Sequence, residues 1–308
     1  MARYIGVSIG RGLLTLVGVS LIVFTMVRVS GNPLDVLVPD TASAADRANT
    51  AALWGLDRPY PEQYLIFLTN AARGDFGGSF RFSGQPAMGL VFDRLPATLQ
   101  LAGTALLISL LLGVPLGVLS ATHRGTWLDT LATVVAVLGQ SLPPFWLGLM
   151  GIWVFSVLLG WLPTSGRGGL DHMLLPCVVL GLFPVAALVR LIRASMQDVL
   201  SSEYVKLARL KGVAEWKVIW KHALKNAAIA PLTFFGTIAV TLLTGTVIIE
   251  SIFSWPGIGL LALDATTARD FPVVQAVVLF GSVLFILVNT CVDVLYAWVD
   301  PRVRLGRA

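Results

Sequence analysis

The sequence predicts an all-α polytopic membrane protein with six transmembrane helices. Of its 308 residues, 56% are apolar and only 13% are charged, whereas about 25% of the residues in an ordinary globular domain are charged. The apolar residues gather in six runs, each long enough to cross a bilayer core, which takes about 20 helical residues. Basic residues gather between alternate runs. Composition, run length and charge placement thus indicate the same fold class.

The first apolar run, residues 9–30, is interrupted by two arginines but is long enough to span the membrane. A cleaved signal peptide is the alternative, because Arg3 gives a basic start and Ala42-Ser43-Ala44 resembles a cleavage site. That site lies too far beyond the apolar run, and the run is longer than the apolar part of a usual signal peptide. We therefore expect residues 1–30 to form a retained transmembrane helix.

Five further spans are expected at about 97–121, 130–160, 174–195, 227–250 and 273–297. The run 130–160 is overlong, so we expect its tail, from Leu158 to Leu162, to turn at the membrane surface. Several spans contain Pro, which membrane helices tolerate when neighbouring groups or water satisfy the freed carbonyl groups. Gly113 and Gly117 form a small-xxx-small face, a weak indication of close helix approach.

The placement of Lys and Arg predicts the orientation in the membrane. With the amino terminus inside, the inner segments hold most of the 22 basic residues. Most of the others lie in the connection 31–96, which is long enough that its charges should have little influence. We therefore expect both termini in the cytoplasm. The net charge of +5 does not indicate a nucleic-acid partner, because the basic residues occupy short loops between apolar runs.

The connection 31–96 is predicted to form a small ordered cap between the first two spans. Residues 62–72 are expected to form a short helix after two prolines, and residues 73–81 a glycine-rich turn. This turn is not a phosphate-binding loop, because the chain contains no Gly-Lys dipeptide and therefore no Walker A motif. The two cysteines and three histidines show neither disulfide nor metal-ligand spacing.

One long basic stretch, EYVKLARLKGVAEWKVIWKHALKNAAIAP (residues 203–231), separates the fourth and fifth spans. Gly212 predicts a bend between two helices, because glycine costs about 1 kcal/mol inside a helix. In the second helix, Val213, Trp216, Trp220 and Ala223 recur at helical spacing. Three interpretations are open: a solvated loop, a helix lying on the lipid surface, or a helix that docks into a groove of a partner protein.

Resemblance decides between these interpretations, because the stretch resembles the cytoplasmic coupling loop of ABC-importer permeases. The general importer pattern begins Glu-Ala-Ala and ends Ile-x-Leu-Pro around a central glycine, and only Ala208 and Leu224 match those two elements. Both departures resemble the dipeptide and oligopeptide branch of the family. The residues that fit this branch are Glu203, Tyr204, Val205, Ala208, Arg209, Lys211, Gly212, His222, Ala223, Leu224, Asn226 and Ala227.

The same resemblance extends over nearly the whole chain. Asn32-Pro33 and the Gly-Asp-Phe-Gly-x-Ser element that starts at Gly74 are similar to the external segment of peptide permeases. Residues 250–259 (ESIFSWPGIG), Asp270-x-Pro272 and the closing Asp300-Pro301-Arg302 also match. The resemblance implies an ABC type I importer permease with four parts. They are a first helix at 1–30, an extracytoplasmic cap at 31–96, a five-helix core at 97–297 with a coupling loop at about 198–226, and a cytoplasmic tail at 298–308.

The resemblance implies a transport subunit without ATPase activity, which forms half of a pathway for di- or oligopeptides. Its implied partners are a second related permease, one or two ABC ATPase subunits and an extracytoplasmic substrate-binding protein, in a prokaryotic plasma membrane. No cofactor would bind this chain directly, since ATP and magnesium would bind the partner ATPases. Similar permeases carry nickel, glutathione or haem. The implied ATPase-coupling residues are Glu203, Tyr204, Ala208, Arg209, Lys211, Gly212, Glu215, Trp216 and Trp220.

Polar groups within the spans are candidates for the pathway or its outer gate, because ionisable residues are expensive at membrane depth. The polar candidates are Gln140, Ser141, Glu250 and Asn289, and Phe253 in the turn after the fifth span is a further candidate for the outer gate. Each has a structural alternative: Glu250 pins the following turn, and the amides and hydroxyl pack between helices. Arg190 and Arg193 are expected to extend to the inner surface. An autonomous carrier is a less favoured function, because the two halves show no mirrored repeat, and an intramembrane enzyme lacks its motifs.

Overall fold

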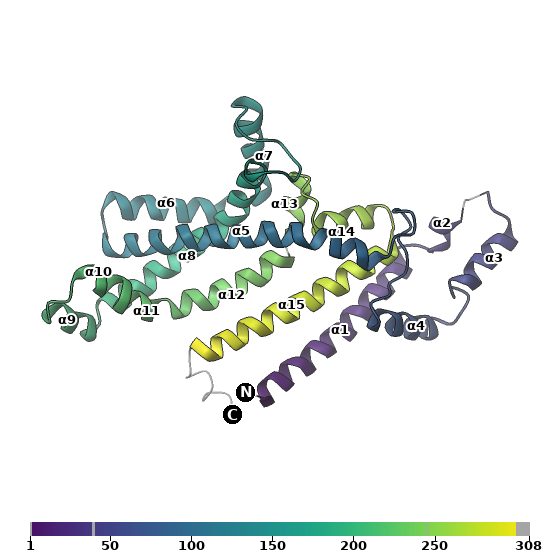
Figure 1. The fold of residues 1–308 in the computed structure, drawn as a ribbon, viewed down its shortest axis with the longest axis horizontal. Coiled ribbons are helices and arrows are strands. Elements are labelled where there is room, and N and C mark those ends of the chain that lie inside the picture. The colour runs from purple at the N-terminus through teal and green to yellow at the C-terminus, as the bar shows by residue number, and fades with distance from the viewer. Residues whose placement is uncertain (1, 39–40, 245, 300–308) are drawn as a thin grey trace. The chain divides into compact units, whose positions relative to one another are not determined.

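The computed structural model describes residues 2–38, 41–244 and 246–299, and within these residues every regular element is helical (Figure 1). The one β-type contact described is an isolated bridge between Gly78 and Pro86. The chain divides into two compact units. The first comprises residues 1–96 and 256–290, and the second comprises residues 97–255 and 291–308. The all-helical fold class predicted from the sequence is confirmed.

The first unit is built on a long amino-terminal helix and the short helices that follow it. Its elements are α1 (Ala2–Ser30), α2 (Leu34–Leu37), α3 (Ala44–Leu53), α4 (Tyr60–Ala72), the start of α5 (Ala87–Thr122), α14 (Ile258–Thr267) and most of α15 (Phe271–Val299). The start of α5 packs against α14 and α15 in a core that includes Val91, Ala265 and Val273. The short helix predicted at 62–72 is confirmed as α4.

Local signals explain the short helices of this unit. Ser43 and Asp46 form a reciprocal capping box that begins α3, and α4 begins after Pro59 with a second proline in its first turn. Helix α4 is attached to α1 by a hydrogen bond between the hydroxyl groups of Ser20 and Tyr64, 2.9 Å long. An aromatic cluster extends this contact, because Phe24 of α1 packs against Tyr64 and Phe67. Helix α4 is therefore held against α1.

The second unit is organised around α8 (Leu170–Leu200). Its other elements are the remainder of α5, α6 (Trp127–Ser141), α7 (Pro144–Gly151), η1 (Ile152–Leu158), α9 (Glu203–Leu210), α10 (Glu215–Lys217), η2 (Val218–Ala223), α11 (Leu224–Ala227), α12 (Ile229–Thr244) and α13 (Val247–Ile252). The protein buries 72% of the apolar window of α8, against 39% for α5. In Figure 1, α5 and α6 lie alongside α8.

Glycines let these three helices approach closely. A Cβ atom at Gly113 would lie 2.9 Å from Leu188 Cβ, and one at Gly117 would lie 2.8 Å from Ile192 Cβ. On α6, a Cβ atom at Gly139 would lie 2.8 Å from Ala186 Cβ. Real Cβ contacts are not this short, so each of these sites accepts only glycine without movement of α8. The small-residue face predicted at Gly113 and Gly117 is confirmed.

Four helices of the described chain are long and apolar enough to cross a membrane by themselves: Gly10–Ser30 of α1, α5, α8 and Phe271–Val292 of α15. Two bent helical pairs bring the number of candidate spans to six if each pair is one span. The first pair is α6 with α7 and η1, bent by 104°, and the second ends in α12 and is bent by 58°.

The run 130–160 departs from the continuous span expected there. Helix α6 ends at Ser141, and the following helix begins at Pro144. Pro143 and Pro144 explain this break, because each lacks an N–H group and each disfavours helical geometry in the residue before it. The expected turn of the tail is present, since η1 ends at Leu158 and Gly160 has a φ of +63°. The run 227–250 is likewise divided into α12 and α13.

We expect Gly117→Ala to destabilise the second unit by about 1–3 kcal/mol, because its new methyl group would overlap Ile192. The matched control is Gly103→Ala in the same helix, where a Cβ atom would meet nothing within 4 Å. Helix propensity alone should make that control neutral or stabilising by about 1 kcal/mol. Thermal unfolding of both variants in the same detergent measures the difference, and equal midpoints would contradict the packing argument.

Candidate functional site

The basic stretch 203–231 folds into a helical hairpin whose turn depends on Gly212. Helix α9 ends with the N–H of Gly212 donating to the carbonyl of Arg209 and the N–H of Val213 donating to the carbonyl of Ala208. These bonds form a Schellman motif, in which the residue after the C-cap adopts a left-handed conformation. Gly212 has a φ of +75°, which costs other L-residues about 1–2 kcal/mol. The predicted bend at Gly212 is confirmed, and its cause is this turn.

Side-chain contacts hold the two arms of the hairpin together. Arg209 Nη2 donates to Glu215 Oε1 at 2.7 Å, across the turn. The pKa of Glu215 is lowered because its carboxylate accepts these hydrogen bonds from Arg209, so the pair stays charged at neutral pH. Asn226 Nδ2 donates to the hydroxyl oxygen of Tyr204 at 3.0 Å and joins α9 to α11. Val205 is fully buried between the arms and the rest of the unit. The hairpin is therefore a fixed structure, not a solvated loop.

The second arm is wound partly as a π-helix, η2, and this changes which side chains face the core. Val218 and Ala223, five residues apart, are both fully buried. Ala223 joins a core cluster with Ile192 and Met196 of α8. Trp216 and Trp220 of the predicted stripe are 63% and 44% exposed, whereas Ala223 is fully buried, so the stripe does not lie on one face. A π-turn places residues five apart on one face, which the α-helical period does not anticipate.

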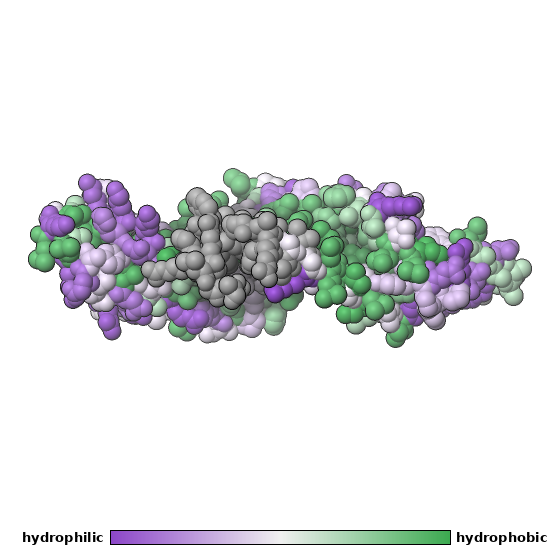
Figure 2. Space-filling model, turned by 90° about the horizontal axis from the view of Figure 1, so that it is seen from below, coloured by the Kyte–Doolittle hydropathy of each residue, from purple (hydrophilic) through white to green (hydrophobic). Residues whose placement is uncertain are grey.

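The exposed face of the hairpin combines large apolar side chains with positive charge. Trp216 and Trp220 lie beside Lys217, whose ammonium group is 5.5 Å from the Trp216 ring centroid. Leu207 and Leu210 of α9 are 52% and 85% exposed. Figure 2 shows green and purple side chains mixed at the left end of the molecule, where Figure 1 places α9 and α10. Such exposed apolar patches mark interaction surfaces.

Glu250 and Trp255 attach helix α5, at Ala97 and Thr98, to α13 and the turn that follows it. Glu250 is fully buried and accepts hydrogen bonds from Thr98 Oγ1 at 2.8 Å and Thr246 Oγ1 at 2.7 Å. Trp255 is also fully buried, and its Nε1 donates to the carbonyl of Ala97 at 2.8 Å. Phe253 is 2% exposed in the same core. These contacts favour the structural alternative for Glu250, which pins the following turn.

The three remaining pathway candidates belong to α6 and α15. Gln140 and Ser141 are the last two residues of α6, next to the break before α7. Gln140 Nε2 is buried and has no hydrogen-bond partner among the described residues, whereas Ser141 is exposed. Asn289 is an exposed residue of α15 in the first unit. Whether these residues meet a substrate stays a prediction.

Sequence reasoning missed a buried ion pair that joins three helices of the second unit. Arg193 Nε of α8 lies 2.9 Å from Asp129 Oδ1 of α6, and Ser120 Oγ of α5 donates to the same oxygen at 2.6 Å. The N–H of Gly125 donates to Asp129 Oδ2 at 3.0 Å. Arg193 is thus paired beside the turn that precedes α6 and is about one third exposed, and its extension to the inner surface stays a prediction. Arg190 is exposed, as that expectation requires.

In the first unit, two of the quoted motifs meet at a buried carboxylate. Asp270, of the Asp-x-Pro motif, is fully buried and accepts a hydrogen bond from the hydroxyl of Ser79, in the glycine-rich turn. The backbone N–H groups of Phe80 and Arg81 donate to the same carboxylate, each at 3.2 Å. Asp270 thus fixes the glycine-rich turn against the start of α15.

Comparison with known proteins assigns the chain to a family. Residues 113–305 match the family model described as the binding-protein-dependent transport system inner membrane component. The chain belongs to this family. It is a permease component of a binding-protein-dependent ABC importer and resides in the inner membrane. Membership implies partner ATPase subunits and a substrate-binding protein, and the permease subunits of such importers lack ATPase activity themselves.

Several characterised relatives align over nearly their whole length. The dipeptide transport system permease protein DppB of Alkalihalophilus pseudofirmus is 36% identical over 94% of this chain and 95% of its own. The oligopeptide transport system permease protein AppB of Bacillus subtilis is 38% identical over 99% of this chain and 100% of its own. The glutathione transport system permease protein GsiC of Escherichia coli K12 is 40% identical over 94% of this chain and 95% of its own.

Solved structures support the fold. Inward-facing structures of the MetNI methionine ABC transporter contain a chain that matches 69% of this one with a TM-score of 0.55. The match covers 97% of that chain at 16% sequence identity, so it is evidence for the fold alone. About a third of the present chain therefore lies outside the match.

We expect Gly212→Ala to loosen the hairpin, because alanine costs about 1–2 kcal/mol at the left-handed position that Gly212 occupies. Gly212→Asn should have a smaller effect, since asparagine tolerates this conformation better. Hydrogen exchange of the amides in residues 203–217 is the measurement, and the alanine variant should exchange roughly tenfold faster for each 1.4 kcal/mol lost. Equal exchange in all three proteins would contradict the assigned turn.

We expect Asp270→Asn to destabilise the first unit by about 2 kcal/mol, because the amide group of asparagine cannot accept as many hydrogen bonds from Ser79, Phe80 and Arg81. The control is Asp264→Asn in α14, a side chain that is only partly buried. Limited proteolysis within residues 73–86 measures the effect. Cleavage should accelerate in the Asp270 variant alone, and unchanged cleavage would refute the role of the carboxylate.

Proposed function

We propose that this chain forms half of the membrane pathway of an ATP-driven importer of di- or oligopeptides. A second, related permease completes the pathway, and an extracytoplasmic binding protein delivers the peptide. The support for the substrate class is the similarity to dipeptide and oligopeptide permeases over nearly the full length. The relative named for glutathione transport fits the same class, because glutathione is itself a short peptide. Nickel and haem are the alternative cargoes.

The observation that carries the coupling role is the exposed aromatic and basic face of the hairpin. Interface hot spots favour tryptophan in well-packed pockets, so Trp216 and Trp220 suit a groove on an ATPase subunit. Glu203, Lys211 and the Arg209–Glu215 pair would supply the polar rim, and Tyr204 and Ala208 the packing beneath it. ATP and Mg²⁺ would bind the ATPase subunits, not this chain. Both termini and the hairpin would face the cytoplasm.

The packing of the hairpin suggests how movement would reach the membrane spans. Ala223 and Ala227 belong to the same core as Leu188, Ile192 and Met196 of α8. Because the arms of the hairpin are joined by Arg209–Glu215 and Tyr204–Asn226, displacement of its exposed face would move α8 as a whole. Closure of the ATPases on ATP would thus switch the pathway between outward-facing and inward-facing states.

An autonomous secondary transporter is the competing hypothesis. It is tested by reconstituting the chain alone in proteoliposomes and measuring peptide uptake. We expect no uptake without the ATPase subunits and the second permease, and ATP-dependent uptake with them. Uptake by the chain alone would refute the proposal that transport requires the ATPase subunits and the second permease.

We expect Trp216→Asp to reduce ATP-coupled uptake by the assembled importer at least roughly tenfold, because a hot-spot aromatic contributes about 2 kcal/mol or more to an interface. Gly212→Pro should have the same result, since proline cannot adopt a φ of +75°. Trp216→Phe is the control and should retain most of the activity. Membrane insertion of all variants is checked by extraction and gel filtration. Normal uptake by the aspartate variant would count against the docking role.

A further inference from the structure

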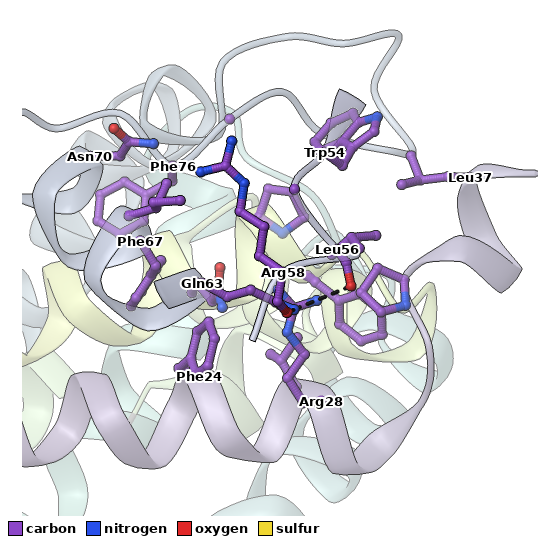
Figure 3. Close-up of a pocket in the computed structure, with 18 of the residues that line it drawn as sticks. Phe24, Arg28, Leu37, Trp54, Leu56, Arg58, Gln63, Phe67, Asn70 and Phe76 are labelled. Atoms are coloured by element: carbon purple, nitrogen blue, oxygen red, sulfur yellow. Dashed lines mark hydrogen bonds between the residues drawn. The ribbon is translucent and has the colours of Figure 1, made fainter. Parts of the chain in front are cut away.

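The first unit contains a cavity of about 390 Å³ (Figure 3), and none of the residues that line it belongs to the hairpin of residues 203–227. It opens between the outer end of α1, helix α4, the loop that precedes α4 and the glycine-rich turn. Ligand pockets for small molecules typically measure about 300–1,000 Å³, so this cavity is large enough for a short peptide.

Arg28 contributes an unpaired positive charge to this cavity. Its Nε is buried without a partner, and its guanidinium group makes no hydrogen bond or ion pair with the residues that the structure describes. The guanidinium group lies over the Phe24 ring, whose centroid is 5.1 Å from Cζ. By contrast Arg58, which lines the same cavity, is bonded to Glu62 at 2.9 Å. Arg28 is half-buried, and a cation that is partly withdrawn from water without an anionic partner is costly, so Arg28 indicates an anionic ligand.

Gln63 contributes an unpaired acceptor to the same cavity. The side chain is 9% exposed, and its Nε2 donates to the carbonyls of Leu56 at 3.2 Å and Arg58 at 2.7 Å. These two acceptors fix the orientation of the amide, because a flipped amide would place its oxygen against two carbonyl oxygens. Gln63 Oε1 is therefore assigned to the cavity side, where it is buried without a hydrogen-bond partner. An N–H donor on a ligand would satisfy it.

The remaining wall is largely aromatic. Figure 3 shows Phe24, Phe67 and Phe76 gathered on one side of the cavity and Trp54 on the other. Asp75 also lines the cavity, but its Oδ1 accepts a hydrogen bond from the N–H of Gly77 and so belongs to the turn. A ligand that fits this lining carries an anionic group, an N–H donor and an apolar side chain.

We infer that this cavity binds the carboxyl-terminal part of a short peptide, with its carboxylate on Arg28, a backbone N–H on Gln63 Oε1 and an apolar side chain against the aromatic wall. The inference rests on the proposed function for its ligand class. A second, apolar groove lined by Leu21, Val29 and Tyr64 also reaches Arg28, so a lipid headgroup is the competing source of the anion. A phosphate diester has no N–H group for Gln63 Oε1, so a lipid would need a donor elsewhere in its headgroup, whereas every backbone amide of a peptide supplies one.

The test is equilibrium binding of the dipeptide Ala-Phe and of its carboxyl-terminal amide to the purified chain in nanodiscs of phosphatidylcholine. The free acid should bind at least roughly tenfold more tightly than the amide, since hydrogen bonds to charged groups are the stronger class. Arg28→Gln should abolish the difference between the two ligands, and Arg28→Lys should retain part of it. Gln63→Leu should weaken both ligands. Arg73→Gln, a solvent-exposed arginine outside the cavity lining, is the matched control and should leave both affinities unchanged.

Several outcomes would overturn the inference. Equal affinity for the acid and the amide, or no binding at millimolar peptide, would refute the carboxylate site. Native mass spectrometry that finds phosphatidylglycerol retained by the wild type but lost from Arg28→Gln would assign the site to a lipid headgroup instead. Peptide uptake by the assembled importer is measured in parallel. Uptake without binding to this chain would refute the cavity site alone, whereas no uptake of any peptide would refute the proposed substrate class.

Discussion

A polar group that is buried in the protein is costly unless it has a hydrogen-bond or ionic partner, because neither the protein core nor hydrocarbon offers water in its place. Three buried carboxylates meet this requirement through contacts within the protein. Glu250 accepts hydrogen bonds from two threonines, Asp270 from a serine and two backbone amides, and Asp129 from a serine while it is paired with Arg193. Each carboxylate joins segments that are far apart in the chain. These buried carboxylates therefore hold together the helices and turns that they join.

Close packing around α8 is the second constraint. Helices α5 and α6 approach it through glycines, so their backbones contact Leu188, Ile192 and Ala186 directly. In a membrane, helix association depends on such van der Waals contact, because lipid tails are as apolar as the side chains they replace. The hairpin of residues 203–227 joins this packing through Ala223 and Ala227. A movement of the hairpin thus acts on the most buried helix of the second unit.

Much of the fold follows from local sequence signals, and the rest depends on contacts between distant residues. Run length predicts the long helices, Pro59 predicts the start of α4, and Gly212 predicts the turn of the hairpin. Pro143-Pro144 explains the sharp break after Ser141, but the run 130–160 is predominantly apolar, so its composition predicts one continuous span. The pairing of Arg193 with Asp129 joins residues 64 positions apart, so no local pattern indicates it. The same holds for Arg28 and Gln63, whose unpaired atoms are evident only once α4 lies on α1.

The π-turn of η2 has a consequence for how the hairpin can change in evolution. The extra residue shifts the register of the arm by one, so Val218 and Ala223 both point inward while Trp216 and Trp220 stay outside. Because a π-turn is an α-helical turn with one residue inserted, loss of a single residue from 218–223 would restore α-helical winding and leave the flanking turns in register. Loss of two residues would exceed what removal of the π-turn absorbs, and would rotate the downstream side chains by about 100° around the axis. The arm between Glu215 and Ala227 should therefore tolerate the deletion of one residue far better than the deletion of two.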